Sequence, residues 1–133
     1  ISLPVMANSY YSYVYQNTDI GVFPSRCEAG TNLVLMEYMA CGKPVIATVG
    51  TGQADVVNES NGFKISAKPN IVIRENNDIL NNWEEPDLDS VIESLDYAYH
   101  NRSKIKKLGL AGAKLMTNFT WEIMANKILK LIP

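Results

Sequence analysis

The sequence contains few of the residues on which metal, disulfide and nucleic-acid binding depend. Only two of its 133 residues are cysteines, Cys27 and Cys41, and their spacing is not that of a metal site. They predict reduced thiols in a cytoplasmic protein, so neither a disulfide framework nor a bound metal is expected. The formal net charge of −2, without a stripe of basic residues, argues against a nucleic-acid partner.

Long apolar runs are absent as well. No stretch approaches the length needed to span a membrane, and no signal peptide, internal repeat or low-complexity tract is recognisable. With 47% hydrophobic and 20% charged residues, the composition is that of one globular domain over residues 1–133. The chain starts with Ile1 and runs at once into a strand-like segment, so we expect a fragment of a longer protein.

The apolar segments that are present concentrate between Asp19 and Ala47. Ile20–Phe23 has the length and composition of a buried strand. After a loop, good N-cap residues predict a helix that starts at Leu33 and ends at Gly42. Val45–Ala47 is a second short apolar run. A strand, a helix and a strand in this order predict parallel pairing of the two strands.

Glu37 is the only charged residue between Ala29 and Gly42. A helix that is apolar on nearly every side is expected to be buried, and an unpaired carboxylate within it would be costly. We therefore expect Glu37 to face a cleft or a hydrogen-bonding partner. Because helical side chains tilt toward the N-terminus, it should lean toward the loop that carries Glu28.

The run FPSRCEAGTNLVLMEYMACGKPVIAT, residues 23–48, resembles the donor-binding motif of the retaining, GT-B-fold glycosyltransferases of the group 1, glycogen-synthase-like family. In that family a loop glutamate contacts the transferred sugar, and a second glutamate on the helix binds the nucleotide ribose. Glu28 and Glu37 match these by context, one residue further apart than in the family pattern. The resemblance continues through Thr48–Gly52, Asn61–Phe63 and Phe119–Glu122.

The resemblance implies a site that binds a nucleotide-diphosphate sugar and needs neither metal nor a further cofactor. It makes Glu28 the catalytic candidate. The donor-binding candidates are Arg26, Ala29, Gly30, Thr31, Asn32, Leu33 and Glu37. For Arg26 the plainer expectation is a salt bridge to Glu28. A complete family member also uses an Arg and a Lys from earlier in its domain, which this sequence does not contain, so we expect no transfer by this chain alone.

Partners and location follow from the same resemblance. The acceptor, a sugar, lipid or protein, would bind through an N-terminal domain that is missing from this sequence. The parent protein is expected in the cytoplasm, including the inner face of a membrane, and the fragment is expected to self-associate through its uncovered edge strand, Ile1–Leu3.

Other segments have weaker patterns. Asn8 or Ser9 caps a predicted helix to Gln16, with Tyr10, Tyr13 and Val14 on its packing face. Asn61 and Gly62 predict a turn before a short edge strand, Phe63–Ile65. Residues 66–85 read as a surface insertion, with a brief strand at 71–73 and Trp83 as its anchor to the body.

Three helices are predicted to complete the chain. Pro86 and Asp87 begin one that ends near His100, Ser103 caps the next to about Thr117, and Thr120 caps the last to about Leu131. The last helix is expected to be buried by Ile123, Ile128, Leu131 and Ile132.

The expected fold is a three-layer, Rossmann-like α/β domain, with a parallel sheet and helices on both faces, as part of a GT-B C-terminal domain. Two other functions are compatible with the sequence. One is a sugar-nucleotide epimerase of the same fold, and the other is a non-catalytic α/β interaction module, for which a lone carboxylate in an apolar helix would have no purpose.

Overall fold

The computed structural model describes residues 5–76 and 78–132. The segment Ile1–Leu3, which the sequence predicts to be a strand, lies outside the described residues. Both cysteines are free thiols. Within the described part, no helix combines the length and the apolar composition that crossing a membrane would require.

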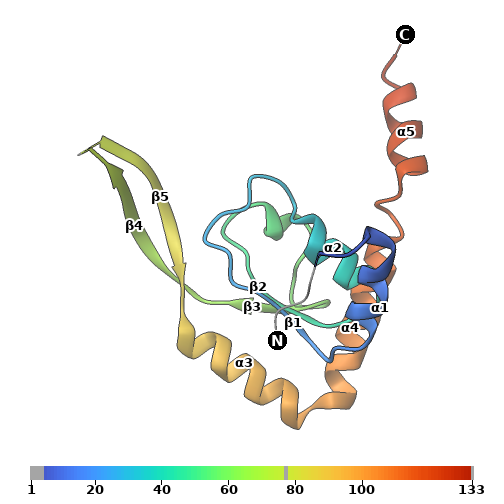
Figure 1. The fold of residues 1–133 in the computed structure, drawn as a ribbon, viewed down its shortest axis with the longest axis horizontal. Coiled ribbons are helices and arrows are strands. Elements are labelled where there is room, and N and C mark those ends of the chain that lie inside the picture. The colour runs from blue at the N-terminus through green and yellow to red at the C-terminus, as the bar shows by residue number, and fades with distance from the viewer. Residues whose placement is uncertain (1–4, 77, 133) are drawn as a thin grey trace.

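A three-stranded parallel sheet forms the centre of the body (Figure 1). It consists of β1 (Gly21–Phe23), β2 (Val45–Thr48) and β3 (Phe63–Ile65), in that order. Gly21 pairs with Val45 and Ile46 pairs with Phe63. The predicted parallel pairing is confirmed, because α2 (Leu33–Ala40) crosses from β1 to β2 and returns the chain in the same direction.

Helices cover both faces of the sheet, as predicted. All four residues of β2 are buried. Val45 and Ala47 point to one face, where they join a core with Leu35 and Met39 of α2 and Met116 of α4 (Arg102–Met116). The opposite face is covered by α3 (Leu88–His100), which lies along β2 and β3. The body therefore has the three layers of a Rossmann-like α/β domain.

The N-terminal helical segment packs through other tyrosines than predicted. It comprises η1 (Asn8–Tyr10) and α1 (Tyr11–Gln16). Tyr10 and Tyr13 are 63% and 70% exposed, so the predicted packing face is wrong. Tyr15 is the residue that packs on the body, with its ring edge-on to Tyr38 at a centroid distance of 5.4 Å.

Helix α2 begins and ends where the sequence predicts, but it is not buried on all sides. Asn32 caps its start by accepting a hydrogen bond from the Leu35 amide at 3.1 Å, and Gly42, with φ +74°, follows its end. Leu33 and Val34 are 73% and 52% exposed. Apolar residues are spread evenly around α2, so the sequence did not indicate which side of the helix faces solvent.

Two of the three helices after the sheet, α3 and α5, begin where the sequence predicts. Asp87 caps α3 by accepting from the Ser90 amide, and Thr120 caps α5 (Trp121–Leu129) by accepting from the Ile123 amide. Helix α4 starts at Arg102, with Asn101 in the cap position that was predicted for Ser103.

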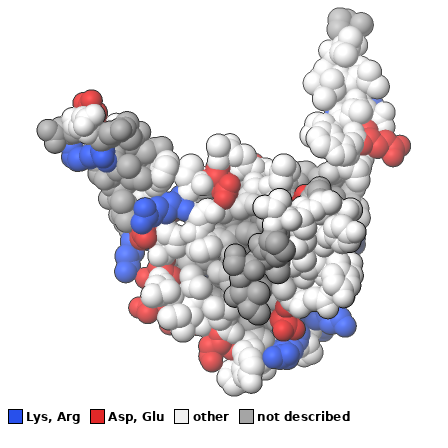
Figure 2. All heavy atoms as spheres, viewed as in Figure 1, with Lys and Arg blue, Asp and Glu red and all other residues white. Residues whose placement is uncertain are grey.

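Helix α5 is not buried, contrary to the prediction. None of its residues is buried, and Ile128, Leu131 and Ile132 are 52%, 82% and 62% exposed. The helix projects from the body (Figure 1), and its surface is mostly uncharged on the face that Figure 2 shows. Apolar spacing predicts an amphipathic helix but not that a neighbouring element of the same chain covers it.

Residues 66–86 form a more regular element than the predicted insertion. Two nine-residue antiparallel strands, β4 (Ala67–Glu75) and β5 (Asp78–Pro86), make a hairpin that extends away from the body (Figure 1). Trp83 lies in β5 opposite Ile71 of β4. The polar composition of the second strand concealed it, because such a strand lacks the apolar alternation of a half-buried one.

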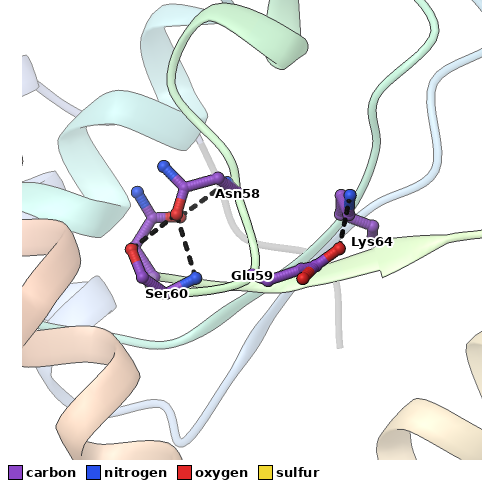
Figure 3. A network of polar contacts seen from close by, with 5 residues as sticks. Asn58, Glu59, Ser60 and Lys64 are labelled. Atoms are coloured by element: carbon purple, nitrogen blue, oxygen red, sulfur yellow. Dashed lines mark hydrogen bonds and ion pairs between the residues drawn. The ribbon is translucent and has the colours of Figure 1, made fainter.

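The turn before β3 is held by side-chain hydrogen bonds (Figure 3). Asn58 Oδ1 accepts from the amide and hydroxyl of Ser60, and Lys64 pairs with Glu59 at 2.9 Å. Asn61 is buried, accepts from the Asn58 amide at 2.8 Å and donates to the Val56 carbonyl at 2.9 Å. This confirms the predicted turn and fixes where β3 begins.

Candidate functional site

The candidate site lies at the carboxyl ends of β1 and β2. The loop after β1, residues 24–32, carries most of the predicted site residues, and the loop after β2 leads through residues 49–51 into η2 (Gly52–Asp55). Since neighbouring parallel strands end at the same sheet edge, the two loops lie together.

Glu28 is held in place by both loops. Its Oε1 accepts hydrogen bonds from Ser25 Oγ at 2.7 Å and from Asn32 Nδ2 at 3.0 Å. Its backbone amide donates to Thr51 Oγ1 at 2.8 Å, and its carbonyl accepts from the Gly52 amide at 3.3 Å. The carboxylate is half-buried, with its direction fixed by two side-chain donors.

Asn32 connects this carboxylate to helix α2. Its backbone is left-handed, with φ +58°, a conformation that asparagine tolerates better than most residues. The side chain donates to Glu28 and accepts from Leu35, so both halves of the amide are used. The positive end of the helix dipole therefore lies beside Glu28.

The predicted donor-binding residues from 29 to 33 lie at the start of α2. Ala29, Gly30 and Leu33 are exposed, and Thr31 and Asn32 are half-buried, with Thr31 Oγ1 directed at Met36 Sδ. Within the described part of the chain, none of the backbone amides of 29–32 donates a hydrogen bond. Exposed amides at a helix start can bind the oxygens of an anion.

Glycine is required where the two loops touch. A Cβ atom on Gly52 would overlap the Gly30 carbonyl. Thr48 Oγ1 donates to the Ser25 carbonyl, which adds a second link between the same loops. Any bulk at Gly52 would therefore displace the loop that carries Glu28.

Glu37 has a partner, but the reason given for expecting one is wrong. It is exposed, and its Oε2 accepts a hydrogen bond from Tyr15 Oη at 3.3 Å, so no burial penalty demands pairing. Burial, and then the negative charge of Glu37, raise the pKa of Tyr15. Glu37 thus points to α1, and no described contact joins it to Glu28.

The salt bridge predicted between Arg26 and Glu28 is wrong. Its Nε forms an ion pair with Glu85 Oε2, near the base of the hairpin, and hydrogen bonding to Glu85 raises the pKa of Arg26. Arg26 thus has its partner in an element far from it in the sequence.

Two features of the site were missed from the sequence. One is the hairpin carboxylates Glu84 and Glu85, for which no local signal exists. The other is Gln53 in η2, which is 1% exposed while neither Nε2 nor Oε1 has a hydrogen-bond partner in the described residues. A polar residue directly after a glycine loop at a sheet edge was the signal available for Gln53.

A separate apolar groove of about 920 Å³ lies at the other end of the sheet. It is lined by residues before β1 and β2, such as Ile20 and Pro44, and by Ile92, Tyr99 and Leu110 of α3 and α4. In open α/β sheets ligands bind outside the carboxyl ends of the strands. The position at the carboxyl ends of the strands therefore favours the loops around Glu28.

The parallel sheet, its two helical layers and the polar loops at one sheet edge place the chain among the Rossmann-like α/β domains. The family model described as "Glycosyl transferases group 1" matches residues 6–82, more than half of the chain. The chain therefore belongs to the group 1 glycosyltransferases.

A solved structure shares the fold of nearly the whole chain. It is sucrose-phosphate synthase from Thermosynechococcus elongatus, with a TM-score of 0.75, 24% sequence identity and coverage of 97% of this chain. The chain spans 28% of that protein. The likeness shows that the two proteins share a fold over this region. Curated protein sequences give no match.

Proposed function

We propose that this chain binds the nucleoside diphosphate part of a nucleotide sugar, as the donor side of a retaining glycosyl transfer. The observation that carries the proposal is the Glu28 carboxylate, oriented by Ser25 and Asn32 at the start of α2. A carboxylate that is fixed by donors on one oxygen keeps its other oxygen for hydroxyl groups of a sugar.

The neighbouring backbone supplies the complementary charge. The amides of residues 29–32 and the positive end of α2 would hold diphosphate oxygens. In glycosyl transfer the leaving diphosphate gains charge as the bond to the sugar breaks, so preorganised donors at that point stabilise the transition state. Family membership supports this assignment of parts.

Glu37 is assigned to the ribose. It is exposed on α2, and Tyr15 restrains it through one carboxylate oxygen, which leaves the other for two neighbouring hydroxyl groups. Glu37→Gln is expected to weaken nucleoside diphosphate binding by about 1–3 kcal/mol, the scale of a hydrogen bond to a charged group.

Calorimetric titration of the chain and of its full-length parent with a panel of nucleoside diphosphates tests the assignment. Glu93→Gln is the matched control, since Glu93 is exposed on α3, on the other face of the sheet. Equal affinities of Glu37→Gln and wild type would contradict the role of Glu37, and no binding of any nucleoside diphosphate by the parent would contradict the function.

Binding without turnover is expected from the chain by itself. Arg26, the cation of the donor loop, is already paired with Glu85, so the charge on a departing diphosphate would be poorly compensated. Transfer of label from a nucleotide sugar by the purified chain, abolished by Glu28→Ala, would contradict this expectation.

A further inference from the structure

The base of the β4–β5 hairpin contacts both loops of the candidate site. Glu85 forms its ion pair with Arg26 in the loop after β1. Glu84 lies against the loop after β2, since a Cβ atom on Gly50 would be 2.7 Å from Glu84 Oε2. Figure 2 shows side chains of opposite charge together where the hairpin leaves the body. Two consecutive residues of β5 therefore join the projecting hairpin to the site.

The segment Ser25–Glu28 is held from two sides. On one side Thr48 and Thr51 bind its backbone, through the Ser25 carbonyl and the Glu28 amide. On the other side the Arg26 side chain reaches Glu85. Since Glu28 is only two residues from Arg26, the ion pair restrains the backbone from which the Glu28 carboxylate projects.

The Glu85 carboxylate depends on this contact. Its Oε2 atom is shielded from solvent, and in the described part of the chain it makes no hydrogen bond beyond the ion pair. Without Arg26, a shielded carboxylate oxygen would have no partner, which is unfavourable. Arg26 also keeps its charge under all ordinary conditions, so the pair persists.

We propose that Glu85 is a positioning residue, which acts through Arg26 to hold the Ser25–Glu28 segment ready for a nucleotide-sugar donor. The inference rests on the proposed function and extends it. Arg26 is then a tether between the hairpin and the donor loop and not a ligand of the diphosphate. Displacement of the hairpin base would be transmitted through this contact to the segment that carries Glu28.

A double-mutant cycle on Arg26→Gln and Glu85→Gln tests the proposal in the complete chain. The first readout is hydrogen exchange of the amides of residues 27–32 without nucleotide, and the second is the affinity for the nucleoside diphosphate that wild type binds most tightly. Each single variant should change both readouts, and the double variant should change them no more than the larger single effect, because all three remove one interaction. We expect about two- to five-fold faster exchange and an equal loss of affinity, the scale of a partly exposed ion pair.

Lys68→Gln is the control. It removes the Lys68–Asp87 ion pair (3.3 Å), at the same end of the hairpin, without touching the donor loop, and should leave both readouts unchanged. Thermal unfolding of every variant confirms that the fold is intact.

Three outcomes would overturn the proposal. They are unchanged exchange in Glu85→Gln, tighter nucleotide binding by Glu85→Gln, and a loss of affinity that Arg26→Gln and the double variant share and Glu85→Gln lacks. The last two would make Arg26 a diphosphate ligand that Glu85 withholds. If no nucleoside diphosphate binds while exchange still changes in the cycle, the proposed function fails and the tether between hairpin and loop stands.

Discussion

Asn32 combines three tasks in one residue. It adopts a left-handed backbone, caps α2 and orients Glu28. Asparagine is suited to all three because it is short, carries a donor and an acceptor, and tolerates positive φ. The geometry of the candidate site and the stability of α2 therefore depend on the same side chain.

Substitution of Asn32 should separate these tasks. Asn32→Gly keeps the left-handed backbone and should cost a few tenths of a kcal/mol in unfolding free energy, whereas Asn32→Ala adds strain and should cost about 1–2 kcal/mol. Urea unfolding measures both. Because each variant removes the donor to Glu28, nucleotide affinity should fall equally in the two. Equal stability of the two variants would show that the backbone conformation is unimportant.

Tyr38 gives the protein a loss of stability at alkaline pH. Burial of its phenol raises its pKa above the ordinary value of about 10, and Asp19 adds to the shift, although the hydrogen bond with Thr18 opposes it. The folded chain holds the neutral phenol, so this contribution is complete below about pH 10 and is lost as the pH rises through the higher folded pKa.

Unfolding free energies measured on both sides of pH 10 should therefore decline more steeply in wild type than in Tyr38→Phe. Tyr13→Phe serves as the control, because Tyr13 is 70% exposed, and it should follow the wild-type curve. Superimposable curves for wild type and Tyr38→Phe would contradict the expectation.

At the scale of single elements, local signals were sufficient for most of the fold. The caps Asn32, Asp87 and Thr120, and the turn at Asn61, were predictable because each acts on residues three to five positions away. The strand, helix, strand order also predicted the parallel sheet. The hairpin was missed because its second strand is polar. The partner of Arg26 and the exposure of α2 and α5 were missed because they depend on residues far away in the sequence.

The same limit explains the site. Glu28, Gly30 and Asn32 were predicted together because they share one loop, and the structure brings them together. The role of Gln53 and the contacts of the hairpin base required the fold. For Glu37 a partner was predicted because burial was expected, but the residue is exposed, and exposure is a property of the packed structure.

Helix α5 should contribute little to stability. Because none of its residues is buried, a chain that lacks residues 121–133 is expected to unfold within about 0.5 kcal/mol of the complete chain. Met116→Ala, in the core at the end of α4, should cost about 2–4 kcal/mol in the same denaturant titration. A cost of the deletion close to that of Met116→Ala would mean that α5 packs on the body in solution.

For the whole molecule, the hairpin and α5 have a consequence for its dimensions in solution. Both leave the three-layer body, in different directions (Figure 1). A compact chain of this length has a radius of gyration of about 14 Å. Small-angle X-ray scattering should give a larger value, and a distance distribution with a long tail.

The hairpin and α5 are the two arms of the molecule, and the tail of the distance distribution measures how far they extend from the body. If a donor, an acceptor or another protein draws either arm against the body, the maximum dimension of the particle shortens even where no chromophore or label is present. Scattering curves that fit a sphere-like particle with a radius of gyration of about 14 Å would mean that the arms are folded back. The extended shape thus makes particle size a direct readout of contact at either arm.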